Sequence, residues 1–196
     1  MASRATIRTA KLAPSDWIRA ALVRLSAQGI DAVRVEALAR DLGVSKGSFY
    51  WHFRDRDDLL EKMLGRWESA ELAWLGPEAG DSAAARWARL IEKTAEPARM
   101  RVEVALRAWA RSDERVAGRM AAIERRKAGS IADVLREVGF ARAAAESWSE
   151  VVLLVCLGWP DKATRDPRFE LASRGLGEIL SQVILAASAR TAASSG

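Results

Sequence analysis

The sequence predicts an all-α fold in which an N-terminal three-helix domain precedes a larger helical domain, with about nine helices in total. Three observations support this prediction. Apolar residues recur at spacings of three and four along almost the whole chain, which is the period of an amphipathic helix. Only five of the 196 residues are proline, and no convincing two-residue alternation typical of a strand occurs. Hydrophobic residues make up 49% and charged residues 29%, a balance typical of a globular protein.

The N-terminal domain holds three predicted helices. The first is expected to begin with Ser15 as its N-cap, because a serine side chain accepts a hydrogen bond from a free amide at a helix start. The second covers about residues 35–42 and is ended by Gly43, and Ser45 can cap a third that continues to about Phe53. These three short helices are close enough in sequence to form one compact unit.

Longer helices are expected after these three. The first of them begins near residues 55–58, where three acidic side chains suit the positive end of a helix dipole. The others are predicted at residues 82–95, 98–111, 113–138, 141–159 and 167–190. The last two carry apolar faces, which favours packing against a partner.

Composition and charge exclude several classes of protein. The net charge is +5, and residues 1–66 hold 12 of the 31 basic side chains against 8 of the 26 acidic ones, which weakly indicates a polyanionic partner. No apolar run reaches the roughly 18 residues of a membrane-spanning helix, so no membrane partner is expected. No signal segment is evident, so we expect a cytoplasmic, nucleoid-associated protein. Cys156 is the single cysteine and is either a small buried apolar side chain or a redox sensor.

The segment from residue 35 to residue 54 has the internal geometry of a helix-turn-helix. Ala39 is small where two helices cross, and Gly43 supplies the positive φ of a tight turn. The wedge that sets the helix angle is expected to be Leu38, Leu42, Val44 and Phe49. The second helix then protrudes, and its exposed residues would be Ser45, Lys46, Gly47, Ser48, Tyr50, Trp51 and His52. Lysine and hydroxyl side chains suit double-stranded DNA because they reach phosphates and base edges.

Alternatives remain open for parts of this segment. The motif is either a DNA-binding element or a helical hairpin without a nucleic-acid role. Tyr50 either contacts DNA or packs in the wedge, and Trp51 either stacks on sugar and phosphate or covers the domain junction. The N-terminal arm is either a further DNA contact or a disordered tail without a partner, and its basic residues are Arg4, Arg8 and Lys11.

The run Gly-Val-Ser-Lys-Gly-Ser-Phe-Tyr-Trp-His-Phe at residues 43–53, with Leu38-Ala39 before it and Asp57-Asp58-Leu59-Leu60 after it, resembles the DNA-binding domain of TetR-type bacterial regulators. The resemblance covers about residues 15–64. It implies an all-helical homodimer that binds a double-stranded DNA operator. It also implies a four-helix dimer interface formed by the last two long helices of each subunit, and a central ligand pocket in each subunit.

The resemblance also assigns site residues. It implies DNA contacts at Lys46, Ser48, Tyr50 and His52. Arg56 stands where the family usually has a lysine that meets the DNA backbone. Arg34 stands where the family commonly has a capping threonine. It cannot accept an amide hydrogen bond, although its charge can still meet a phosphate.

The division of the chain follows from these assignments. We expect a basic arm at residues 1–14, the DNA-binding domain at 15–64, a ligand-binding and dimerisation domain at 65–190 and a flexible tail at 191–196. Six of the eight tryptophans lie in the third segment, where they form either core and interface or the walls of a pocket. The hypothetical pocket, for an apolar or aromatic effector, consists of Trp67, Trp87, Trp109, Met120 and Trp148. The expected dimer interface consists of Trp148, Val152, Val155, Trp159, Leu176, Ile179, Leu180, Val183 and Ile184.

Enzymatic function is disfavoured by the same sequence. There is one histidine and one cysteine, about a hundred residues apart, with no phosphate-binding glycine loop and no spacing typical of metal ligands. We therefore expect no catalytic site, no cofactor and no metal. A helical protein-interaction module without DNA affinity remains a third class. The favoured interpretation is a ligand-responsive DNA-binding repressor, with the operator, the ligand and the direction of regulation left open.

Overall fold

The computed structural model describes residues 12–165 except 77 and 79, together with residues 175, 177, 178 and 180–182. The N-terminal elements are α1 (Pro14–Gln28), the 3-10 helix η1 (Ile30–Ala32), α2 (Val35–Asp41) and α3 (Lys46–Tyr50). The longer elements that follow are α4 (Arg56–Leu75), α5 (Ala83–Ala95), α6 (Pro97–Ala110), α7 (Glu114–Glu137) and α8 (Arg142–Arg165). All regular elements within these described residues are helical, which confirms the predicted fold class.

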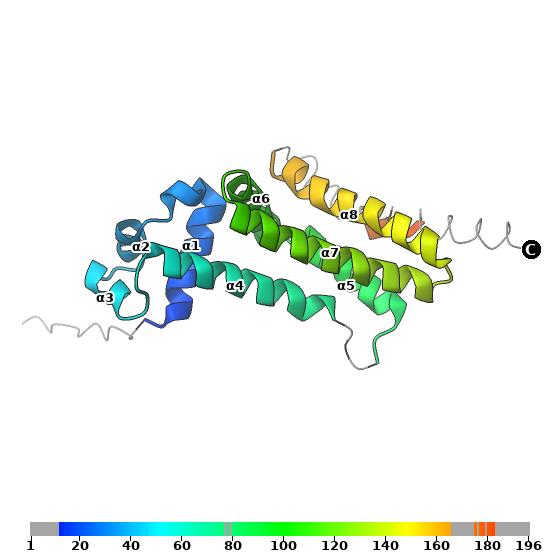
Figure 1. The fold of residues 1–196 in the computed structure, drawn as a ribbon, viewed down its shortest axis with the longest axis horizontal. Helices are drawn as coiled ribbons and strands as arrows, with labels where there is room; N and C mark the ends of the chain where they lie inside the picture. Colours follow the sequence, from blue (N-terminus) through cyan, green and yellow to red (C-terminus); the bar gives the residue numbers. More distant parts are fainter. Residues whose placement is uncertain are drawn as a thin grey trace, which may run out of the picture.

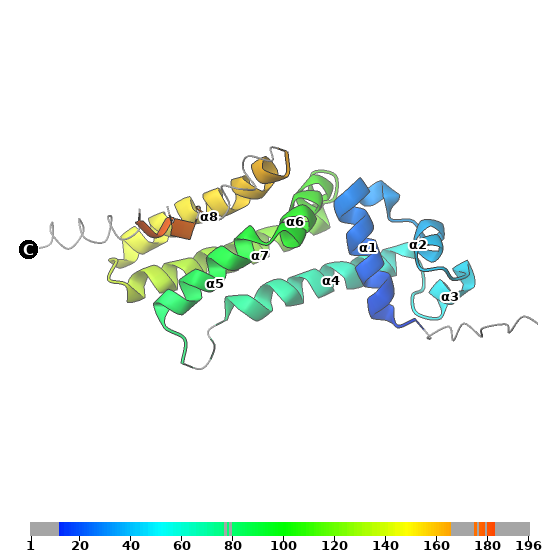
Figure 2. The same cartoon turned by 180° about the vertical axis from the view of Figure 1, so that it is seen from behind.

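The molecule is elongated, with α1, α2 and α3 gathered at one end and the longer helices stacked along its length (Figure 1). The view from behind agrees that α3 lies at the opposite end from the turn that joins α7 to α8 (Figure 2). Helix α4 leaves the small N-terminal group and runs alongside α7. It therefore passes through the boundary expected at residues 64/65 and belongs to both parts of the protein.

The first helix begins two residues earlier than expected. Pro14 occupies the first helical position, where its missing N–H costs nothing, and Ala13 is the N-cap. The amide of Ala13 donates to the carboxylate of Asp16 at 2.8 Å. The expectation that Ser15 is the N-cap is therefore wrong, because Asp16 supplies the polar contact at this helix start.

Helix α8 does not stop before Pro160, as the sequence had suggested, but continues to Arg165. A proline inside a helix removes one backbone donor and disturbs the carbonyls of the preceding turn. Here Arg107 of α6 donates to the carbonyl oxygen of Leu157 at 2.8 Å, which lies next to the Cys156 carbonyl that Pro160 leaves without its helical donor. The buried ring of Pro160 adds packing. The expected final helix lies outside the described residues except for six helical positions between 175 and 182.

Two apolar cores support the architecture. The first joins α1, α2, α3 and α4 to parts of α6 and α7, and includes the buried side chains of Trp17, Phe49, Trp67 and Leu106. The second joins α5, α7 and α8. Because the first core crosses the expected domain boundary, the N-terminal helices are packed against the rest of the chain. Within the described segments, no helix has the length and apolar character needed to cross a membrane.

Candidate nucleic-acid interface

A glycine-centred turn joins α2 to α3. Gly43 has φ +67°, a conformation that favours glycine, and the amide of Val44 donates to the carbonyl of Ala39 at 3.0 Å. Phe49 is fully buried on the inner face of α3. Its ring contacts Trp17 edge to face at 5.3 Å between centroids, and it stacks on Phe53 at 5.1 Å. These contacts anchor a helix of only five residues against α1.

The opposite face of α3 is open to solvent. Tyr50 is 55% exposed and Trp51 is 87% exposed, so Tyr50 does not lie in the wedge and Trp51 does not cover the domain junction. Lys46 is also exposed, and His52 is half-buried. The remaining predicted positions are Ser45 and Gly47, both exposed, and Ser48, which is half-buried. Helix α3 lies at one end of the molecule (Figure 1), and five of the predicted positions on it or next to it are exposed: Ser45, Lys46, Gly47, Tyr50 and Trp51.

Lys46 is held by an acidic partner that the sequence analysis missed. Its ammonium group donates to the carboxylate of Glu36 on α2. This hydrogen bond raises the pKa of Lys46 and lowers the pKa of Glu36, so both groups are charged near neutral pH. The sequence could have indicated this ion pair. A helix-turn-helix brings the start of its first helix, where Glu36 lies, close to the start of its second helix, where Lys46 lies.

The two arginines predicted to meet the DNA backbone have different surroundings. Arg34 is exposed at the N-cap of α2 and makes no capping hydrogen bond with its side chain, and its Nε donates to the carbonyl of Asp31 at 2.8 Å. Arg56 instead points inward. Its Nε and Nη2 donate to the carbonyls of Val33 and Ile30 at 2.6 and 2.9 Å. These carbonyls engage two of its nitrogen atoms, so Arg56 has a structural role, and its contact with a phosphate stays a prediction.

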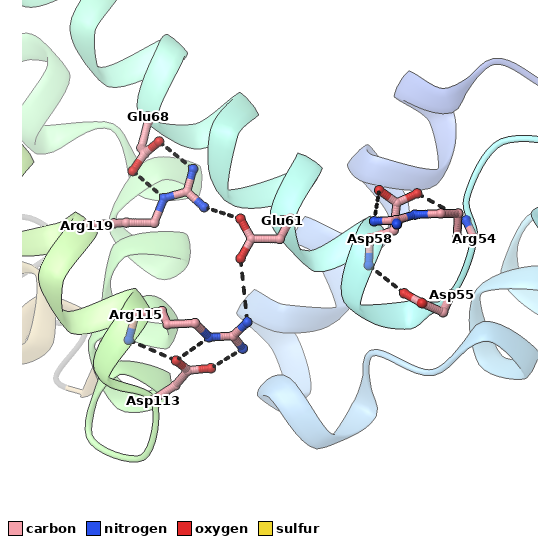
Figure 3. Close-up of polar contacts among 8 residues, drawn as sticks. All are labelled: Arg54, Asp55, Asp58, Glu61, Glu68, Asp113, Arg115 and Arg119. Atoms are coloured by element: carbon pink, nitrogen blue, oxygen red, sulfur yellow. Dashed lines mark hydrogen bonds and ion pairs between the residues drawn. The ribbon is translucent and has the colours of Figure 1, made fainter.

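Two other basic residues flank α3 and were not singled out from the sequence. The side chain of Arg54 is 85% exposed and lies 3.9 Å from Asp58. Lys62 donates to Asp58 at 3.1 Å and lies 5.0 Å from the centre of the Phe53 ring. Asp55 caps α4 by accepting from the amide of Asp58 (Figure 3). Positively charged groups therefore continue from α3 onto the first turns of α4. Arg4, Arg8 and Lys11 of the arm lie outside the described residues.

Ion pairs connect α4 to α7. Arg119 donates from Nε and Nη2 to the two carboxylate oxygens of Glu68 at 2.6 and 2.7 Å, and from Nη1 to Glu61 at 2.8 Å (Figure 3). Arg115 lies 3.8 Å from Glu61 and is also held by Asp113. The hydrogen bond with Glu68 raises the pKa of Arg119. The helix that starts beside α3 is thus tied by charge to the core of the larger domain.

The five residues of the hypothetical pocket do not form one cavity. Trp67, Trp109 and Met120 are buried in the first apolar core. Trp87 and Trp148 pack against the second core, and the indole N–H of Trp87 donates to the Ser181 hydroxyl at 2.8 Å. The expectation of a single pocket is therefore corrected. Helical spacing identifies an apolar face but does not say which neighbouring helix it meets.

The expected dimer residues are also divided. Val152 is buried inside the second core, so it is not available to a partner, and Leu180 is buried too. Trp148, Val155 and Trp159 are half-buried. Four further residues lie outside the described part of the chain, namely Leu176, Ile179, Val183 and Ile184. The apolar side chains that α8 does expose are one position away from those predicted: Val151 at 48% and Leu154 at 67%.

Cys156 lies in the second core rather than at a reactive surface. It is buried on α8, and burial raises the pKa of its thiol above the ordinary value. A neutral buried thiol is a poor nucleophile. The lone histidine, His52, lies after α3 at the other end of the fold, where the helix-turn-helix packs around Phe49.

Comparison with known proteins identifies the N-terminal part by sequence. The family described as "Bacterial regulatory proteins, tetR family" matches residues 18–63. The tetracycline repressor protein class A from transposon 1721 of Escherichia coli is 43% identical over 53 residues, which are 27% of this chain and 24% of that protein. The HTH-type transcriptional regulator AcrR of Shigella flexneri is 37% identical over 51 residues, 26% of this chain and 22% of that protein. The match thus spans about a quarter of these relatives.

The fold of the larger part is also shared with a known protein. The crystal structure of a transcriptional regulator from Rhodococcus sp. Rha1 superposes with a TM-score of 0.70, at 21% identity, over 90% of this chain and 97% of that chain. At this identity the likeness shows the fold. By sequence, residues 18–63 match the TetR family of bacterial regulatory proteins, and the helices beyond them share the fold of the Rhodococcus transcriptional regulator.

Proposed function

We propose that this protein is a sequence-specific DNA-binding transcriptional regulator. In this proposal it works as a homodimer and represses its genes until a small, largely apolar or aromatic ligand lowers its affinity for the operator. The observation that carries the proposal is the exposed face of α3, which presents Lys46, Tyr50 and Trp51 beside the buried anchor Phe49. A rigidly anchored helix with cationic and aromatic side chains on its outer face is suited to the major groove.

The surroundings of α3 support contact with a polyanion. Arg34, Arg54 and Lys62 are exposed on the segments before and after the helix-turn-helix, and such side chains can reach phosphates. Lys46 is charged and pairs with Glu36 in the free protein. On DNA, a guanine acceptor or a phosphate would compete with Glu36 for this ammonium group, so the cost of breaking the pair contributes to specificity.

Pairing of two subunits is supported by the exposed apolar side chains of α8. Val151 and Leu154 are separated by three positions and therefore lie on one face of the helix. Burying that face against a second copy would remove it from water. A dimer with two α3 helices about 34–36 Å apart can dock in successive major grooves. A ligand that shifts α4 relative to α7 would change this separation, and the Arg119 ion pairs provide a connection through which the shift would pass.

The proposal is tested by measuring binding of the full-length protein to DNA from upstream of its own gene, using fluorescence anisotropy between 50 and 200 mM salt, a range over which counterion release changes affinity steeply. Lys46→Ala should weaken binding and make the slope of log K against log salt less steep by about one. Lys93→Ala is the matched control, because Lys93 is a partly exposed lysine on α5, away from α3. Absence of binding at low salt, or equal loss in both variants, would refute the DNA-binding role.

A further inference from the structure

Five charged side chains meet inside the larger domain, between α4, α6 and α7. We call them the buried charge cluster; they are Glu71, Arg99, Glu103, Arg107 and Lys127. Lys127 Nζ lies 3.2 Å from the carboxylate of Glu71 and 2.9 Å from that of Glu103. Arg107 approaches Glu103 at 3.1 Å, and Arg99 pairs with Glu71. Glu71, Glu103 and Lys127 are themselves buried, which is rare for charged residues.

The charges of this cluster do not balance. Three cations face two carboxylates, which leaves one positive charge in excess. Burial would raise the pKa of Glu103, but the attraction of Lys127, Arg107 and Arg99 is larger in sum and keeps this pKa below its ordinary value. Burial raises the pKa of Glu71 despite Lys127 and Arg99, so any protonation there adds to the positive excess. Arg99 and Arg107 are half-buried, and an excess of positive charge that is partly removed from water stabilises an anion.

The cluster also has hydrogen-bond donors to spare. Arg99 Nε and both Nε and Nη2 of Arg107 are buried without a hydrogen-bond partner. Nη2 of Arg107 lies near Glu103, as an ion pair without hydrogen-bond geometry. Buried donors in proteins are nearly always paired, so several N–H groups without a hydrogen-bond acceptor at one place call for one. A carboxylate fits because it accepts several such bonds and is negatively charged.

A small cavity adjoins Arg99 of this cluster. Its volume is about 10 Å³, roughly one water molecule, and three members of the cluster line it: Arg99, Glu103 and Lys127. The rest of the wall is largely apolar and comes from α5, α7 and α8, through Leu90, Thr94, Ile131, Leu153, Cys156 and Leu157. The Cys156 thiol stays neutral because burial raises its pKa, so this wall adds no negative charge. The site is therefore cationic on one side and apolar on the other.

We propose that the ligand of this regulator is an organic monocarboxylate with an apolar body, held by the buried charge cluster. The carboxylate accepts from Arg99 and Arg107, and the apolar body replaces side chains of the wall formed by α5 and α8. A carboxylate cancels the excess charge and accepts from the donors, whereas a neutral alcohol can accept a hydrogen bond but leaves the charge excess, and a cation increases the imbalance. This inference rests on the proposed ligand-responsive function, and it names the chemical class of the ligand.

The test uses the full-length protein and two sets of probes at equal ionic strength. Hexanoate is compared with 1-hexanol and hexylamine, and benzoate with benzyl alcohol and benzylamine, by thermal shift and titration calorimetry. At least one acid should bind about tenfold or more tightly than its alcohol, because hydrogen bonds to charged groups are the stronger ones. Equal binding of acid and alcohol, preferred binding of an amine, or no binding of either acid would overturn the inference.

Variants of opposite sign make the test specific. Arg107→Gln removes the positive excess and should weaken acid binding about tenfold or more, whereas Glu71→Gln increases the excess and should tighten it. Arg111→Gln is the matched control, because Arg111 is an exposed arginine at the end of the same helix. If Arg107→Gln does not fold, Glu71→Gln still decides. Unchanged acid affinity in the cluster variants refutes the carboxylate site, while operator binding of the ligand-free protein reports separately on the proposed DNA-binding function.

Discussion

Arg56 provides a sharp test of the structure, because its role there differs from the phosphate contact that the sequence suggested. Its guanidinium group donates to the carbonyls of Ile30 and Val33 and so ties the start of α4 to the connection between α1 and α2. We predict that Arg56→Lys lowers the stability of the protein although it keeps the charge. An ammonium group is a single point donor and does not reproduce the fork of two separated N–H groups.

The magnitude follows from the two hydrogen bonds. Each bond from a charged donor contributes roughly 1.5–3 kcal/mol when it is protected from water. Arg56 is half-buried, so the lower part of this range applies. Arg56→Lys should therefore cost about 1–2 kcal/mol, and Arg56→Met, which keeps most of the apolar stem but has no donor, about 2–3 kcal/mol. For a chain of this size, these losses correspond to a fall in Tm of roughly 2–4 °C for each kcal/mol.

The assay combines urea denaturation with the salt dependence of DNA binding. Arg54 is the matched control, because its side chain is 85% exposed only two positions away. Arg54→Met should leave the free energy of unfolding nearly unchanged but reduce the salt slope by about one if Arg54 meets a phosphate. The reasoning about Arg56 is refuted if Arg56→Lys is as stable as the wild type while Arg56→Met loses one unit of salt slope.

Four further predictions test other parts of the structure. Phe49→Ala should destabilise the protein by about 3–5 kcal/mol in urea denaturation, since the ring is fully buried between Trp17 and Phe53; a loss below about 1 kcal/mol would contradict this packing. Arg119→Gln should cost about 1 kcal/mol at low salt and less at high salt, because its carboxylate partners are partly exposed; a loss that salt does not reduce would contradict an electrostatic link. Leu154→Lys should shift the protein from dimer to monomer in sedimentation velocity, whereas Val23→Lys, an equally exposed apolar position on α1, should leave the mass unchanged. The amide of Arg54 and the ammonium group of Lys62 lower the pKa of Asp58. The stabilising contribution of Asp58 is therefore present above the ordinary aspartate pKa and is lost as pH falls through the pKa in the folded protein. Asp58→Asn should remove that part of the acid sensitivity of unfolding, and an unchanged pH profile would contradict this prediction.

The helix-turn-helix could be predicted from sequence because its determinants are local. The turn depends on one glycine, Gly43, and the orientation of α3 depends on apolar residues of the same N-terminal segment, from Trp17 to Phe53. Helical periodicity assigns Phe49 to the inside and Tyr50 and Trp51 to the outside, and the structure agrees. The position of most helix boundaries was likewise predictable, since caps and glycine stops act within one turn.

Contacts between distant segments were decided by the tertiary structure. Periodicity defines an apolar face of α8, but only packing shows that Val152 is in the core and Leu154 is exposed. Likewise, the sequence does not show whether a charged side chain will be exposed to water or buried in the interior. Glu71 and Lys127 are 56 positions apart, and only the crossing of α4, α6 and α7 removes them from water. Local sequence therefore determined the DNA-facing end of this protein, whereas long-range packing determined its buried charges, because desolvation depends on neighbours that the chain brings together only when it folds.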